Sequence, residues 1–284
     1  MWHVIRKTQG ALDWQGRSKG CSGIRLYLMR LMAIFPHPDD EIGVSGTLAK
    51  HARRGDAVKL VWLTRGELAS QFGDTPPEEV AQIREGHGRA VAQILGAEYE
   101  FLGYPDAGLT GGREEALMLA QKIAAWKPDV VFTWDPYDVH PDHRAAYWAT
   151  LSALKFCRIP KLVGVRAQPP ALASVAEVAG TRASSRPEGL GENGGGVALE
   201  AHRSPVRLLH YYRSDLPRPA IYVDISETIE VAEEVFRLYQ AFYRWEYSPE
   251  AFRASRARLG QEAGVKFAER FQSEGPLPLG YLPG

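Results

Sequence analysis

From residue 31 onwards, the sequence alternates between short apolar runs and longer segments with helical periodicity. The apolar runs predict strands at 31–35, 57–64, 99–103, 129–134, 207–212 and 220–225, and the periodic segments predict helices at 46–54, 77–95, 114–126, 141–156, 226–243 and 249–271. Strands that alternate with helices form right-handed βαβ units around a parallel sheet. We therefore expect an α/β fold, a Rossmann-like three-layer sandwich with a mostly parallel central sheet.

The length of 284 residues is enough to bury one large core. We expect a single domain over residues 29–275. Residues 1–28 have no strand or helix period and predict a loosely ordered extension, so Met29 or Met32 would be a more natural chain start. Residues 169–203 are rich in turn formers and predict a flexible surface insertion, and residues 276–284 predict a tail.

Composition narrows the class of partner. Lys and Arg together number 34, as do Asp and Glu, so no net charge attracts nucleic acid or an anionic membrane. The apolar stretch at 24–35 is short and interrupted by Arg25 and Arg30, which argues against a membrane span. The two cysteines, Cys21 and Cys157, are too few for a disulfide framework. We expect a cytoplasmic protein that binds neither nucleic acid nor membrane, and we leave open whether it is a homo-oligomer.

Two segments pair imidazole with carboxylate: residues 37–41 read HPDDE, and residues 140–143 read HPDH. The first directly follows a predicted strand and the second lies shortly after another. In an open parallel sheet, ligands bind in the crevice beyond the carboxyl ends of the strands. Two such segments could converge there on one ion. Three nitrogen and oxygen ligands with an open position are typical of a catalytic zinc site.

Within the first segment, His37 and Asp40 lie three residues apart across a turn, so both could face one point. Asp39 lies between them and could instead reach a water as a general base. His140 and His143 share one face at the start of a helix, and their spacing leaves open which of them binds metal. Either tetrapeptide alone could equally be a turn. The occurrence of both at the ends of predicted strands favours the metal site.

These segments, together with 46–49 (GTLA), 63–67 (LTRGE), 94–97 (ILGA), 104–106 (YPD) and 268–271 (AERF), resemble the LmbE-like (PIG-L) zinc-dependent N-deacetylases over residues 29–275. The resemblance implies that His37, Asp40 and His143 bind Zn²⁺, with Fe²⁺ as an alternative ion. It implies that Asp39 is the general base and that His140 steadies the tetrahedral intermediate and helps to protonate the leaving amine.

Further roles follow from the same resemblance. Asp142 would hydrogen-bond to a histidine of the site and orient its ring. Arg65 and Asp106 would contact substrate, although Arg65 could equally pair with Glu67 or another acidic residue of the rim, and residues 104–108 could simply be a turn.

Other residues predict structural roles. Arg84 and Glu85 lie in the middle of a predicted helix, where we expect them to form a solvated or bracing pair. The aromatic residues of 236–245 are at helical spacing, which is more typical of core or subunit contact than of a sugar platform.

The expected function is zinc-dependent hydrolysis of the N-acetyl group of an N-acetylglucosamine-containing small molecule, releasing acetate and a free amine. Two alternatives remain. The same site could hydrolyse an ester or phosphoester, or the protein could bind a sugar or metal without turnover. A nucleotide-dependent enzyme is disfavoured, because the first strand–helix turn lacks Gly-x-Gly-x-x-Gly and carries carboxylates that would repel a pyrophosphate.

Overall fold

The computed structural model describes residues 28–164, 199–243 and 245–275. The expected N-terminal extension, most of the expected insertion and the expected tail lie outside these residues. The strands are β1 (Arg30–Phe35), β2 (Ala57–Thr64), β3 (Glu98–Tyr104), β4 (Val130–Thr133), β5 (Arg207–Tyr211), β6 (Ala220–Asp224) and β7 (Ala268–Ser273). The helices are α1 (Ser45–Arg53), α2 (Pro77–Leu95), α3 (Arg113–Trp126), α4 (Pro141–Phe156), α5 (Pro160–Val163), α6 (Ile229–Tyr243) and α7 (Pro249–Ala263), with short 3-10 turns η1 (Asp40–Gly43) and η2 (Ser70–Phe72).

The strands form one seven-stranded sheet in the order β3-β2-β1-β4-β5-β7-β6. The first five strands in this order are parallel, whereas β7 runs antiparallel to both β5 and β6. This arrangement confirms the predicted α/β fold with a mostly parallel sheet. Chain order reverses direction between β1 and β4, which makes the crevice between their carboxyl ends the switch point where ligands bind in such sheets.

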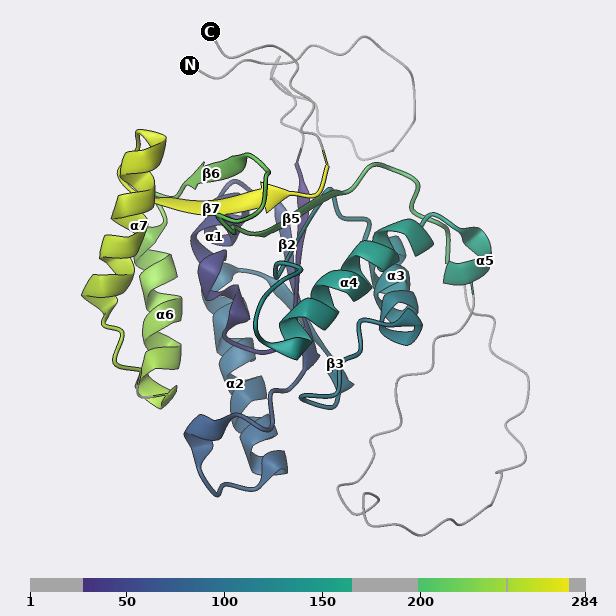
Figure 1. The fold of residues 1–284 in the computed structure, drawn as a ribbon, viewed down its shortest axis with the longest axis horizontal. Coiled ribbons are helices and arrows are strands. Elements are labelled where there is room, and N and C mark those ends of the chain that lie inside the picture. The colour runs from purple at the N-terminus through teal and green to yellow at the C-terminus, as the bar shows by residue number, and fades with distance from the viewer. Residues whose placement is uncertain (1–27, 165–198, 244, 276–284) are drawn as a thin grey trace, which may run out of the picture.

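Helices cover both faces of the sheet, as Figure 1 shows. Because side chains alternate along a strand, β1 sends Met32 and Ile34 to one face and Leu31, Ala33 and Phe35 to the other. The first face packs against α3, α4 and α5 and the second against α1, α2 and α6. The burial of both faces explains why the strands read as continuous apolar runs.

The boundaries follow local signals in most elements. α2 begins with Pro77 and ends at Gly96, which adopts the left-handed conformation (φ 64°) predicted for a C-cap. α4 begins with Pro141 in its first turn, also as predicted.

The predicted helix over residues 249–271 is wrong in its second half. α7 ends at Ala263, Gly264 adopts a left-handed φ of 71°, and residues Ala268–Ser273 form β7. β7 fills the gap between β5 and β6 in the sheet. In the described part of the chain, no helix is both long and apolar enough to cross a bilayer.

Candidate active site

The loop that follows β1 folds back on itself at the carboxyl edge of the sheet. The backbone N–H of His37 donates to Asp40 Oδ2 at 2.8 Å, and the N–H of Asp40 returns a bond to the His37 carbonyl at 3.3 Å. Asp39 sits between them with a φ of 117°, a conformation that costs a non-glycine residue energy and is typical of functional sites. The turn therefore places the His37 and Asp40 side chains, both largely buried, side by side.

The second segment begins α4. His140 is the N-cap residue, and its Nδ1 accepts a hydrogen bond from the N–H of Asp142 at 3.2 Å. His143 lies in the first turn, and its ring stacks on that of His140 with a centroid distance of 4.6 Å. Burial lowers the pKa of His140, and the neighbouring imidazoles of His37 and His143 lower it further. His140 is thus disposed to be neutral with its hydrogen on Nε2.

The two segments meet. His143 Nε2 lies 3.2 Å from Asp40 Oδ1, and His37 Nδ1 lies 3.5 Å from Asp40 Oδ2. Donors about 2.0–2.2 Å from a tetrahedral ion are about 3.3–3.6 Å apart, and each of these two contacts, one to either oxygen of Asp40, is close to that spacing. Nitrogens of His37, His140 and His143 also lie within 4.8 Å of one another, which makes His140 a geometric alternative as a third ligand.

The charges around these imidazoles favour a cation. Burial alone would lower the pKa of His37, but hydrogen bonds to Asp106, Asp142 and Asp40 raise it well above its usual range. Burial alone would also lower the pKa of His143, but the Asp40 carboxylate raises it. The nitrogen and oxygen donors, their spacing and this surplus of carboxylates fit a divalent ion such as Zn²⁺ or Fe²⁺.

The two adjacent aspartates differ in environment. Burial raises the pKa of Asp39 to about 7, although the Arg84 guanidinium opposes the shift. Burial would raise the pKa of Asp40 as well, but His143 and His37 hold it far below its usual value. Two carboxylates with separated pKa values are typical of a site in which one binds a cation and the other exchanges protons.

Asp138, to which sequence reasoning assigned no role, orients His143. Its Oδ1 accepts a hydrogen bond from His143 Nδ1 at 2.8 Å and another from the backbone N–H of His140, also at 2.8 Å. His143 Nε2 is thereby left facing Asp40, as a carboxylate–histidine–metal arrangement requires. The only sequence signal was an aspartate two residues before His140, a spacing at which its carboxylate can bond a backbone N–H.

Asp142 contacts the other histidine. Its Oδ2 lies 3.4 Å from His37 Nε2. The side chain is fully buried and also accepts hydrogen bonds from the N–H groups of Ala107 and Leu109. Asp106 Oδ1 lies 3.0 Å from the same His37 nitrogen. Asp106 is thus partly engaged with the histidine rather than free for a sugar hydroxyl.

Arg65 and Arg84 have different side-chain partners. Arg65 pairs with Glu78 through two hydrogen bonds of 2.9 and 3.2 Å, as in the alternative that paired it with an acid of the rim. Arg84 was predicted to form a solvated or bracing pair with Glu85. Instead Arg84 is 4% exposed, and its Nη2 lies 3.1 Å from Asp39 Oδ2.

Arg84 also ties together the loops that follow β1 and β2. Its guanidinium donates hydrogen bonds to the carbonyl groups of Pro38 and Gly66. A Cβ at Gly66 would lie 2.6 Å from this guanidinium, and the φ of Gly66 is 65°, so only glycine suits the position. Arg84 was missed because helical periodicity does not show which loops a helix covers.

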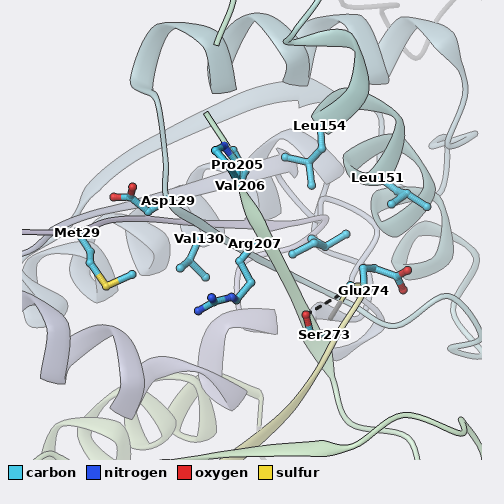
Figure 2. A pocket seen from close by; sticks show the side chains of 12 residues that line it. Met29, Asp129, Val130, Leu151, Leu154, Pro205, Val206, Arg207, Ser273 and Glu274 are labelled. Atoms are coloured by element: carbon cyan, nitrogen blue, oxygen red, sulfur yellow. Dashed lines mark hydrogen bonds between the residues drawn. The ribbon is translucent and has the colours of Figure 1, made fainter. Parts of the chain in front are cut away.

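Many of these side chains line a hollow of about 410 Å³. Its charged and imidazole lining residues are His37, Asp39, Asp40, Arg84, Asp106, His140 and His143, and the others are Leu68, Ala69, Ser70, Gln71 and Ala107. A different cavity of about 530 Å³ lies at the amino ends of β1, β4 and β5 (Figure 2). Its lining is mostly apolar and contains no histidine, whereas residues of both the 37–41 and the 140–143 segments line the first hollow.

Residues 32–154 match the family model described as PIG-L: GlcNAc-PI de-N-acetylase. Over these residues the chain belongs to the PIG-L family. A diacetylchitobiose deacetylase of Thermococcus kodakarensis is 25% identical over 84% of this chain and 81% of its own. A conserved protein of Thermus thermophilus has a solved structure that matches with a TM-score of 0.64 and 30% identity, covering 90% of this chain and 98% of its own.

A 1D-myo-inositol 2-acetamido-2-deoxy-alpha-D-glucopyranoside deacetylase of Kineococcus radiotolerans is 32% identical, over 44% of each chain. The alignment with this relative thus spans less than half of its length. The PIG-L matches and the residues of the hollow agree in chemistry, since the named relatives hydrolyse N-acetyl amides. The protein is therefore an amidohydrolase of this family.

Proposed function

We propose that this PIG-L protein removes the N-acetyl group from an N-acetylglucosamine-containing small molecule and releases acetate and a free amine. The proposal is supported by the lining of one hollow by His37, Asp39, Asp40, His140 and His143, in which His143 Nε2 and His37 Nδ1 lie 3.2 and 3.5 Å from the Asp40 carboxylate oxygens. The names of the relatives, which act on diacetylchitobiose and on an acetylated glucosaminyl inositol, support the same class of substrate.

His37, Asp40 and His143 would hold the metal ion, Zn²⁺ or Fe²⁺. When bound, such an ion polarises the amide carbonyl and makes water acidic enough to ionise near neutral pH. The orientation of both imidazoles by carboxylates supports this ligand set: Asp138 holds His143, and Asp142 lies against His37.

The remaining residues supply proton transfer. Asp39 lines the hollow and accepts a proton from the attacking water as the carbon–oxygen bond forms. His140 accepts a hydrogen bond at Nδ1, so its neutral ring presents Nε2–H to the oxygen on which charge develops. Collapse of the tetrahedral intermediate then breaks the carbon–nitrogen bond, and the proton that Asp39 took from water passes to the leaving amine beside His140, which restores the Asp39 carboxylate and releases acetate.

The proposal also covers the partner of the enzyme and its location in the cell. A formally neutral chain suits a small sugar conjugate as partner rather than nucleic acid, and we place the enzyme in the cytoplasm. The group attached to the sugar would contact the part of the hollow that Leu68, Ala69, Ser70 and Gln71 line.

The test is a panel of N-acetylated sugars, including diacetylchitobiose and N-acetylglucosaminyl inositol, incubated with the metal-loaded protein. We expect acetate and primary amine in equal amounts from at least one of them. Asp39→Asn should keep the metal but lower kcat by about 10²–10³-fold, since it removes only the base. Phosphate release from phosphoesters without amine formation, or full turnover by Asp39→Asn, would contradict the proposal.

A further inference from the structure

Glu41 ends the first motif, yet it does not face the hollow. Its side chain is fully buried, and its carboxylate accepts three hydrogen bonds. Oε2 accepts from the backbone N–H of Asp39 at 3.1 Å and from Trp62 Nε1 at 3.1 Å, and Oε1 accepts from the hydroxyl of Tyr239 at 2.5 Å. A buried carboxylate with this many donors is held in one orientation.

The hydrogen bond from the Asp39 N–H to Glu41 involves the residue with the most unusual backbone conformation. Asp39 is one of only three non-glycine residues with positive φ in the described part of the chain, and its φ of 117° is the most extreme of them. Such a conformation persists only when surrounding contacts determine it. Since the side chain of Asp39 leaves the backbone at this residue, the Glu41 bond helps to set the direction in which its carboxylate points.

Tyr239 supplies the fixed end of this chain of contacts. It lies on α6, 198 residues from Glu41 in sequence. Its side chain is fully buried in the core between the sheet and helices α1, α2 and α6. α6 also packs against α1 and α2. The hydroxyl is therefore anchored by a helix that belongs to neither motif.

We propose that Tyr239 is a positioning residue for the reaction, which acts through Glu41 to hold the backbone of Asp39 in its active conformation. The inference rests on the proposed function, in which Asp39 is the base. Misplacement of a reacting group by a fraction of an ångström lowers turnover without weakening the binding of substrate. Loss of the Tyr239 hydroxyl should thus lower kcat and leave KM and metal content unchanged.

Tyr243 offers a matched control on the same helix. It is buried four residues further along α6, and its hydroxyl has no hydrogen-bond partner among the described residues. Tyr239→Phe and Tyr243→Phe each remove one buried hydroxyl and keep the ring, so they differ in the contact with Glu41.

The experiment measures kcat, KM, bound metal and Tm for both variants with diacetylchitobiose, or with whichever member of the panel turns over best. We expect Tyr239→Phe to lower kcat about tenfold and Tyr243→Phe to change it less than twofold. In an Asp39→Asn background, Tyr239→Phe should lower the residual kcat less than twofold, because the group it positions is already lost. If Tyr239→Phe does not fold, Glu41→Gln takes its place with the same expectations.

Equal kcat values for the two phenylalanine variants would overturn the inference, and so would a tenfold loss that persists in the Asp39→Asn background. These outcomes are distinct from failure of the proposed function. If Asp39 is not the base, Asp39→Asn alone retains full turnover, whatever the tyrosine variants do.

Discussion

Carboxylates on either side of the hollow hold the two histidines that we propose as metal ligands. Asp138 bonds to His143 Nδ1, whereas Asp106 and Asp142 approach His37 Nε2. Each ring therefore has one nitrogen engaged by an acid and the other turned toward Asp40. A metal ion arriving at Asp40 would meet two imidazoles already oriented to bind it.

Asp138→Asn is expected to weaken metal binding about 10–100-fold, because the amide cannot support the ring as a carboxylate does. A competition titration against a chelating dye measures the affinity. Asp135→Asn is the control: Asp135 lies in the same loop, but it accepts a hydrogen bond from the N–H of Tyr137 instead of a histidine. Equal affinities for the two variants would show that Asp138 does not orient the ligand.

We expect the buried side chain of His87 to make the free energy of unfolding fall at acid pH. It is 5% exposed, neither ring nitrogen has a hydrogen-bond partner among the described residues, and Arg84, Tyr239, Phe242 and Tyr243 surround it. Burial, with the charge of Arg84, lowers the pKa of His87 to about 4.

The unfolded chain, with an ordinary histidine pKa near 6.5, therefore binds more protons than the folded one between pH 6.5 and 4. Stability is lost as the pH falls through this window, and we expect His87→Leu to reduce the loss by about 1–3 kcal/mol. Urea unfolding of both proteins at pH 7 and pH 4.5 measures the difference. An identical pH dependence would show that His87 is protonated at little cost in the fold.

Site residues could be predicted from the sequence where their partners lie in the same turn. His37 and Asp40 lie in one turn, and His140 and His143 in another, so their spacing in sequence is nearly their spacing in space. Arg84 was not predicted, because it reaches Asp39 across a helix–loop contact that no local pattern encodes.

Among the elements, the last strand best shows how far a sequence pattern reaches. The sequence pattern predicted one helix over residues 249–271, whereas α7 ends at Ala263. Gly264 ends α7 instead, because its left-handed conformation permits the chain to turn. The sheet then gains β7, whose antiparallel partners β5 and β6 are distant in sequence and could not be deduced from a local period.

β7 also completes α1. The helix has no side-chain cap of its own, and Glu269 on β7 accepts hydrogen bonds from the N–H groups of Gly46 and Thr47 at 2.9 and 2.8 Å. Because both N–H groups are buried, Glu269→Ala should lower the free energy of unfolding by about 2–4 kcal/mol. Glu269→Gln keeps one acceptor oxygen and should lose less. Equal losses in urea unfolding would contradict the capping role.

At the scale of the whole molecule, the proposed metal joins two distant parts of the sheet. His37 and Asp40 follow β1, and His143 belongs to α4, which follows β4. β1 and β4 are neighbours only because the order of strands reverses between them. The family fold thus brings the two motifs together, and the ion would bind the folded chain but not the unfolded one.

Removal of the metal is therefore expected to lower Tm. A ligand present at about 100 times its Kd stabilises the folded state by about 2.7 kcal/mol, which corresponds to about 5–10 °C for a domain of this size. Calorimetry before and after chelation, and again after Zn²⁺ is restored, measures the change. The same Tm in all three samples would mean that no ion links the two motifs.

The location of the metal tests the account most directly. Crystals grown with Zn²⁺ and measured on both sides of the zinc absorption edge would show the ion as an anomalous peak. We expect one peak in the hollow, about 2.0–2.2 Å from donor atoms of His37, Asp40 and His143. A peak elsewhere, or one at the hollow that these three side chains do not coordinate, would contradict the proposed site.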